Sequence, residues 1–327
     1  MLRFRKSRSF FAVTLLLLIL LVIVAIQVNN REPAEKERKH VSLIVYGDDP
    51  ERWENLRQGA GLVCGEKNAD LSLLTMLSED DAREQKEIIE REIEDGADAL
   101  IIAACDSAEI IDFTNSQNMR IPIALVETTG AFSSPVKNAP VIAPDDYKMG
   151  YELGESLVEN ESDIVTVAII SENTLRDSVS LREQGLRDAI DGKVGKIINW
   201  ERNEHEKDAK TRMFIQRALV SEATDVIVTF DNSTTDALLD ALYNLNTSSK
   251  VYSIATSDKA VYYLYGKEIK VLVYPDEFAM GYLAAMNVLD GTNVLKKYRN
   301  TGIEYRLVTK ENMYDEDNQA LLFPFVN

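Results

Sequence analysis

Short, continuously apolar runs alternate along this chain with amphipathic segments, and no other feature of the sequence limits the possible folds as strongly. The runs lie at residues 41–46, 71–76, 97–104, 121–127, 165–170, 195–200, 225–230, 250–255, 269–274 and 303–310. Strands that are apolar on both faces and separated by helices are typical of a parallel sheet covered on both sides. These strands are too many for one ordinary sheet, so the pattern predicts an α/β protein with two doubly wound parallel-sheet lobes.

The two halves of the chain also carry a similar short motif at a similar position. After the first strand of each half, a loop leads into a helix that carries Leu-Arg-Gln-Gly at residues 56–59 or Leu-Arg-Glu-Gln-Gly at residues 181–185. Gly59 and Gly185 would then occupy equivalent helix positions, where close packing on the sheet leaves no room for a side chain. This similarity indicates two lobes of the same topology.

The N-terminal part of the chain differs from the rest. Residues 1–9 are basic, residues 10–28 are apolar and uncharged, and residues 29–40 are polar without apolar periodicity. A helix over 10–28 would be roughly 29 Å long, close to the thickness of a bilayer core. We interpret these segments as a cytoplasmic tail, a transmembrane signal anchor and a linker, which makes a single-pass membrane protein with its folded part outside the cytoplasm. A cleavable signal peptide is the alternative.

Charge and residue types exclude several functions. The net charge of the chain is −18 despite the basic tail, so the folded part is acidic and would repel nucleic acid. The two histidines, His40 and His205, cannot form a catalytic dyad or a metal cluster, and no nucleophile elbow or phosphate-binding loop occurs. We therefore expect no enzyme activity, cofactor or metal. Cys64 and Cys105 are interpreted as buried free thiols rather than as a disulfide.

Four stretches resemble motifs of one family, in the family's order and spacing. They are the first strand, turn and helix ending in LRQGA (residues 43–60), EDGADALIIAACDS (94–107), VIAPDDYKMGYELGESL (141–157) and DVIVTFDNSTTDALLDAL (225–242). Together they resemble the type I periplasmic binding proteins, the ribose-binding-like sugar-binding proteins whose fold is shared by the ligand-binding half of lac-repressor-type regulators. The resemblance covers about residues 41–310.

The resemblance implies two lobes that close by a hinge motion over a ligand in the cleft between them. Ligands of open α/β sheets lie beyond the carboxyl ends of the strands. The chain would cross between the lobes near Pro144, near Pro275 and around Tyr305. The expected bounds are 41–144 with 276–305 for lobe 1, and 145–275 with 306–327 for lobe 2.

The resemblance also implies which residues contact the ligand. Trp53 corresponds to the family's stacking aromatic, and the other candidates lie in loops that follow the strands. Capping of the next helix is an adequate structural explanation for the Asp106 side chain, and Asp231 and Asn232 could also act as caps. The candidate residues are Asp48, Asp49, Trp53, Asp106, Glu127, Thr128, Ser178, Ser180, Asp231, Asn232, Ser257 and Asp258.

Two departures from the family pattern leave the ligand class open. Ser180 stands where many sugar binders have an arginine, and Tyr274-Pro275 replaces a common glutamine. The expected ligand is a sugar or a similar small polar molecule. The expected partner is the membrane permease of an ABC transporter or, alternatively, a membrane sensor kinase. A non-binding envelope scaffold and an envelope enzyme on the same fold are more distant alternatives.

Overall fold

The structure is a computed structural model, and most of the chain after the N-terminal segment is described in it. The described residues are 15, 17, 18, 21, 38–117, 120–132, 135–137, 139–161, 165–202, 211–245, 247, 249–290 and 302–323. Lys39–Asn327 forms one compact unit, and Met1–Arg38 is a separate one. The predicted cytoplasmic tail lies outside the described residues, as does most of the predicted anchor and linker. No helix within the described residues is long and apolar enough to cross a membrane.

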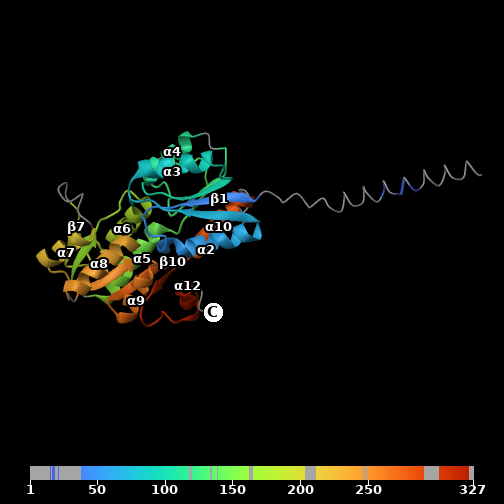
Figure 1. Ribbon diagram of the computed structural model, residues 1–327. Coiled ribbons are helices and arrows are strands. Elements are labelled where there is room, and N and C mark those ends of the chain that lie inside the picture. The colour runs from blue at the N-terminus through green and yellow to red at the C-terminus, as the bar shows by residue number, and fades with distance from the viewer. Residues whose placement is uncertain are drawn as a thin grey trace, which may run out of the picture. The chain divides into compact units, whose positions relative to one another are not determined.

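The first lobe is built on a five-stranded parallel sheet (Figure 1). Its strands, in spatial order, are β2 (Ala69–Leu74), β1 (Lys39–Ile44), β3 (Ala99–Ala103), β4 (Ile123–Val126) and β5 (Val141–Ile142). Its helical segments are η1 (Glu51–Trp53), α2 (Glu54–Glu66), α3 (Ala82–Glu94), α4 (Ser107–Ser116) and α10 (Glu277–Asp290). The apolar side chains of these strands and helices form one continuous core, as expected for strands buried on both faces.

The second lobe is built on a six-stranded sheet. Its strands, in spatial order, are β11 (Tyr305–Val308), β10 (Ile269–Pro275), β9 (Lys250–Ile254), β8 (Val226–Thr229), β6 (Thr166–Ile170) and β7 (Lys196–Trp200). Its helices are α5 (Asp146–Asn160), α6 (Asp177–Ile190), α7 (Thr211–Ser221), α8 (Asn232–Leu245), α9 (Asp258–Gly266) and α12 (Glu316–Leu322). Alternate residues of β6 enter two separate cores, which is the doubly wound arrangement.

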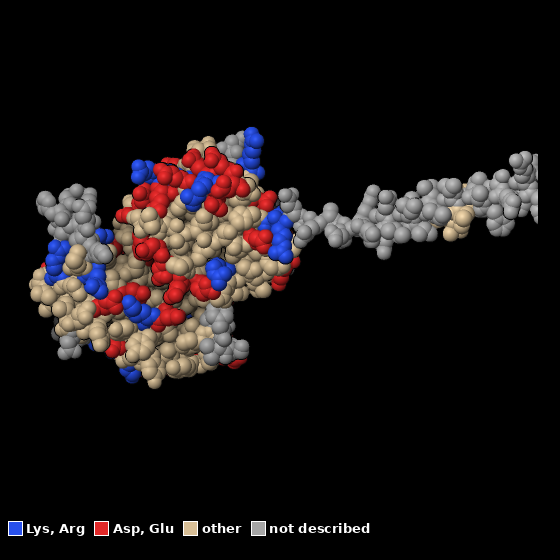
Figure 2. Space-filling view, in the orientation of Figure 1, with Lys and Arg blue, Asp and Glu red and all other residues tan. Residues whose placement is uncertain are grey.

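The prediction of a two-lobed α/β fold is confirmed, with one difference in the sheets. Strand β11 pairs antiparallel with β10, so the second sheet is mostly rather than wholly parallel. The acidic composition is also visible on the surface, where red Asp and Glu side chains outnumber blue Lys and Arg on one face of the compact unit (Figure 2).

The chain passes between the lobes at segments that are hydrogen-bonded to one another. Pro144 leads from β5 into α5 and forms a β-bridge with Ile303. Asp276 leads from β10 into α10, and its N–H donates to the Glu304 carbonyl at 2.9 Å. The crossing segments therefore form one small bonded cluster at the hinge.

Glycines allow unusually close packing between two helix pairs. A Cβ atom at Gly59 would lie 2.0 Å from the Phe278 carbonyl oxygen, and one at Gly185 would lie 2.0 Å from the Tyr147 carbonyl oxygen. The equivalence of the two glycines is therefore real, but each packs against a helix, α10 or α5, rather than against the sheet. Backbones this close exclude any side chain.

Candidate ligand-binding cleft

A cavity of about 510 Å³ lies between the two lobes. The first lobe contributes the loop after β1, the start of α2 and Glu79, and the second lobe contributes Arg176 and the loops that lead into α8 and α9. Leu322 and Phe323, near the C-terminus, complete the lining. The cavity lies at the carboxyl ends of strands from both sheets, which is where ligands bind in open α/β folds.

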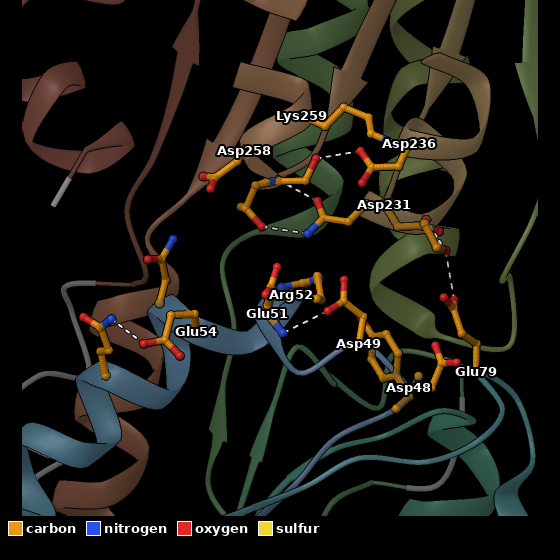
Figure 3. Close-up of a pocket in the computed structure, with 18 of the residues that line it drawn as sticks. Asp48, Asp49, Glu51, Arg52, Glu54, Glu79, Asp231, Asp236, Asp258 and Lys259 are labelled. Carbon is orange, nitrogen blue, oxygen red and sulfur yellow. Dashed lines mark hydrogen bonds between the residues drawn. The ribbon is translucent and has the colours of Figure 1, made fainter. Parts of the chain in front are cut away.

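Six of the residues predicted from the sequence line this cavity, two from the first lobe and four from the second (Figure 3). In the first lobe, Asp48 and Asp49 lie in the turn after β1. The others belong to the second lobe, where the Asp231 carboxylate accepts the Thr234 N–H at 2.8 Å and so caps α8 while it faces the cavity. The six residues are Asp48, Asp49, Asp231, Asn232, Ser257 and Asp258.

Trp53 does not line the cavity, which corrects the prediction that it is a stacking platform for the ligand. Its side chain is fully buried in the first lobe. The indole N–H donates to the Tyr46 carbonyl oxygen at 3.1 Å, and the ring packs edge-on against the Tyr46 ring. The adjacent Arg52 guanidinium lies 4.3 Å above the indole. Tryptophan is therefore present at this helix start as a core residue that supports its neighbours in the cleft.

Three further candidates in the first lobe are held away from the cavity surface. Asp106 caps α4 by accepting the Glu109 N–H at 3.0 Å. Thr128 is fully buried and its hydroxyl donates to the Val126 carbonyl. Glu127 is also buried and is bound by other side chains rather than open to the cleft.

Two serines of the second lobe are likewise outside the main cavity. Ser178 is buried within α6. Ser180 donates its hydroxyl to the Thr174 carbonyl at 2.8 Å and borders a separate, smaller hollow. Neither serine is among the residues that line the main cavity.

Arg52 lines the cavity, although the sequence did not predict it as a site residue, and it binds two buried carboxylates. Its guanidinium lies 2.6 Å from a Glu277 oxygen and 3.1 Å from a Glu127 oxygen. Glu127 also accepts the Tyr46 hydroxyl, and Glu277 accepts the Thr256 hydroxyl. Burial is the largest influence and acts to raise the pKa of Glu127, but the charges of Arg52, Arg182 and Arg176 and the hydrogen bond from Tyr46 together hold that pKa below its ordinary value. Burial dominates at Glu277, whose pKa is raised.

Arg176 is a second cavity-lining arginine that the sequence did not predict, and it also lies close to two carboxylates. Its side chain is almost fully buried, lies 3.1 Å from an Asp231 oxygen and 3.6 Å from a Glu79 oxygen, and covers the Tyr46 ring at 4.1 Å. Burial is the largest influence and acts to raise the pKa of Asp231, but the charge of Arg176 and the hydrogen bonds from Asn173, Ser233 and the Thr234 N–H together lower that pKa. The pKa of Glu79 is raised, mainly by burial. Arg52 directly precedes the predicted residue Trp53 in the sequence. The one sequence signal for its place in the cavity was a positive charge among carboxylates.

A third arginine, Arg182, has a buried N–H group without a hydrogen-bond partner among the described residues. The Arg182 Nε donates to an Asp146 oxygen at 2.7 Å, and its Nη1 donates to the carbonyl of Phe230, the residue before the cavity-lining Asp231. The Arg182 Nη2 and the second Asp146 oxygen have no hydrogen-bond partner among the described residues, although both are buried. With only one oxygen bonded, burial dominates at Asp146 and raises its pKa to about 6.

The cleft thus offers carboxylates, guanidinium groups, hydroxyls and an amide, all of which bind polar ligands by hydrogen bonds. Within the described parts of the chain, no group of three or more His, Cys, Asp and Glu residues could hold a metal ion. Cys64 and Cys105 are both free and buried, as predicted. The arrangement is suited to binding a small polar molecule.

Comparison with known families identifies the class of protein. Residues 41–292 match the family described as the periplasmic binding protein domain, and the chain belongs to that family. It is therefore an extracytoplasmic solute-binding protein and not an enzyme, and the resemblance seen in the sequence is confirmed.

Individual relatives are distant in sequence. The chain is 25% identical over 207 residues to the D-ribose/D-allose-binding protein of Pseudomonas aeruginosa; the match covers 60% of this chain and 64% of that protein, just under two-thirds of its length. The structure of a carbohydrate transporter solute-binding protein from Agrobacterium radiobacter, in complex with D-arabinose, superposes with a TM-score of 0.72 at 19% identity, covering 88% and 99% of the two chains. A chain of the XylFII–LytSN complex superposes with a TM-score of 0.65 at 15% identity, covering 84% and 98%.

Proposed function

We propose that this protein captures a sugar or sugar-like molecule in the interlobe cavity by hinge closure and delivers it to the permease of an ABC transporter. The observation that carries the proposal is the polar cavity of about 510 Å³ between two lobes of a solute-binding fold. A volume of this size is within the range of small-molecule sites. The lobes that close are residues 41–144 with 276–305 and residues 145–275 with 306–327.

The chemistry of the cavity supports a ligand with several hydroxyl groups. A hydroxyl both donates and accepts, so it can satisfy the Asp258 carboxylate and an arginine N–H at the same time. The Pseudomonas relative is named for D-ribose and D-allose, and the Agrobacterium structure holds D-arabinose, which supports the same ligand class.

A thermal-shift screen of the purified chain tests the proposal. The panel contains ribose, allose, arabinose, other sugars, polyols, nucleosides and short peptides. A ligand at 100 times its Kd stabilises the folded state by about 2.7 kcal/mol, which raises Tm measurably. We expect a sugar to give the largest shift. A folded sample that none of these compounds shifts would instead support the non-binding scaffold.

A pair of variants localises the binding to the cavity. Asp258→Ala removes an exposed carboxylate from the lining, whereas Asp188→Ala removes an exposed carboxylate of α6 that accepts the Tyr147 hydroxyl of the same lobe. Loss of a hydrogen bond to a charged group weakens binding roughly tenfold or more. We expect calorimetry to show that weakening for Asp258→Ala and wild-type affinity for Asp188→Ala. Equal affinities in both variants would place the ligand elsewhere.

A second function is favoured by the fold match to a chain of the XylFII–LytSN complex. In this alternative the protein is a ligand sensor that reports to a membrane sensor kinase. Deleting the gene of the permease that the protein is proposed to serve separates the two roles. A transporter role requires ligand uptake to stop while binding persists, whereas a sensor role requires uptake to continue and a ligand-dependent transcriptional response to depend on the kinase.

Residues 10–28 are proposed to anchor the protein in the cell membrane, with the N-terminus in the cytoplasm. The length and apolar character of this segment and the basic residues before it support the proposal. Membrane fractionation of cells that express the full chain or a chain lacking residues 1–28 tests it. An intact N-terminus in the membrane fraction is expected, and a mature protein cleaved after the apolar run would indicate a signal peptide instead.

A further inference from the structure

Three consecutive residues at the start of α6 bind the first lobe, although they belong to the second. The Leu175 carbonyl accepts the Ser107 N–H at 3.0 Å. Arg176 covers the Tyr46 ring and lies 3.6 Å from Glu79. The third residue, Asp177, is bonded to the first lobe through both carboxylate oxygens and its N–H. We call residues 175–177 the interlobe clasp.

The Asp177 carboxylate lies in a ring of hydrogen-bond donors from the first lobe. One oxygen accepts the Thr129 N–H at 3.1 Å, the Thr129 hydroxyl at 3.0 Å and the Ala131 N–H at 3.1 Å, and it also accepts the Gly130 N–H. The other oxygen accepts the Ser107 hydroxyl at 2.9 Å and the Thr129 N–H at 3.2 Å. The Asp177 N–H in turn donates to the Ser107 oxygen at 3.0 Å.

The first lobe is shaped to receive this carboxylate. Gly130 has a φ of +74°, a conformation that favours glycine and turns neighbouring N–H groups toward one point. Successive N–H groups of this kind form an anion-binding nest. Asp177 is only 3% exposed, so its charge is removed from water and depends on the nest. Opening the lobes would break every one of these contacts at once.

The clasp carboxylate is not part of the ligand cavity. Asp177 does not line the 510 Å³ space but borders a smaller hollow with Ser107 and Phe132. The groups that hold it all belong to the protein itself. We propose that the interlobe clasp holds the two lobes together before any ligand is bound, through the insertion of Asp177 into the anion-binding nest of residues 129–131.

This proposal goes beyond ligand capture, because it concerns the protein without ligand. A ligand that binds the closed state gains affinity when that state is already populated. A clasped protein would also present its closed shape to a membrane partner at a basal level, in the absence of ligand.

Distance measurements between the lobes test the clasp in the full chain without any ligand. Spin labels are attached at Glu90→Cys on α3 and Glu155→Cys on α5, which are exposed positions, whereas the native cysteines are buried. We expect the shorter distance of the closed state to predominate over the longer distance of the open state in the wild-type background. Asp177→Ala should raise the ratio of open to closed molecules at least about tenfold, because loss of one hydrogen bond to a charged group has roughly that effect.

The matched control is Asp188→Ala, which removes the same charge from the same helix but only a contact within the second lobe. It should leave the distance unchanged. An Asp177→Ala protein with the wild-type distance distribution would overturn the proposal, and so would an equal change in both variants.

Formate separates loss of the clasp from damage to α6. In Asp177→Gly, free formate can occupy the nest in place of the missing carboxylate. We expect sodium formate, but not sodium chloride at the same ionic strength, to restore the short distance. An open state that formate does not reverse would mean that the substitution acts through the helix, and the clasp would be rejected. Neither result depends on sugar binding, so the clasp can fail while the proposed function stands.

Discussion

Substitution of Gly150 by alanine should separate the helix pair that positions the start of α6. A Cβ atom at Gly150 would lie 1.8 Å from the Arg182 carbonyl oxygen and 2.6 Å from its carbon, whereas an ordinary contact begins near 3.4 Å. The helices α5 and α6 must then move apart by about 1.5 Å, since neither backbone can rotate away. Overpacking usually costs about 1–3 kcal/mol and occasionally more, and alanine returns about 1 kcal/mol of helix propensity. Because the clash here is with backbone, we expect an overpacking cost of about 4 kcal/mol, above the usual range, and so a net loss of about 3 kcal/mol.

Urea unfolding followed by circular dichroism measures this loss in the full chain. The matched control is Gly65→Ala in α2, because a Cβ atom at Gly65 meets nothing within 4 Å. That variant should be equally stable or gain up to about 1 kcal/mol. The reasoning is refuted if Gly150→Ala is as stable as the wild type, since the two helices could then not be in backbone contact.

Three further outcomes follow from the buried side chains. Burial raises the pKa of Asp146 from 3.8 to about 6, so the stability that its protonated form contributes is complete below pH 4 and is lost as pH rises to 6. The free energy of unfolding should therefore fall by about 3 kcal/mol between pH 4 and pH 7. Asp146→Asn should abolish this fall. Trp53→Phe should cost about 1–3 kcal/mol in urea, with ligand affinity in calorimetry unchanged, because the indole bonds Tyr46 inside the lobe. Burial raises the pKa of the Cys64 thiol to about 11 and also raises that of Cys105, so a thiol reagent should label neither residue until the protein unfolds.

The fold was predictable from the sequence because its strands are long, apolar and regularly spaced. The exceptions have physical causes. Strand β5 has only two residues, too few to form a pattern, and the antiparallel pairing of β11 depends on which edge of the second sheet is free. Gly59 and Gly185 were recognised as equivalent, but a sequence cannot tell whether the close neighbour is a sheet or a helix.

The site was harder to predict, because which way a side chain points depends on contacts far along the chain. Trp53 and Arg52 are adjacent at a helix start, and the sequence suggested that the aromatic residue faces the ligand. The indole instead finds a buried acceptor at Tyr46. Arg52 is held at the cavity by Glu277, which is 225 positions away in the sequence. No local pattern carries this information.

The contacts of Glu277 connect the cavity floor with the hinge. Glu277 is the first residue of α10, immediately after the crossing at Asp276, and it binds Arg52 of the first lobe. It also accepts the hydroxyl of Thr256, whose backbone N–H donates to the side chain of the cavity-lining Asn232 in the second lobe. Both lobes therefore meet at one carboxylate that is fixed to a crossing segment. Asn232 and Arg52 are thus joined to this carboxylate, through Thr256 and directly, and we expect a ligand that moves either residue to act through it on the crossing segment.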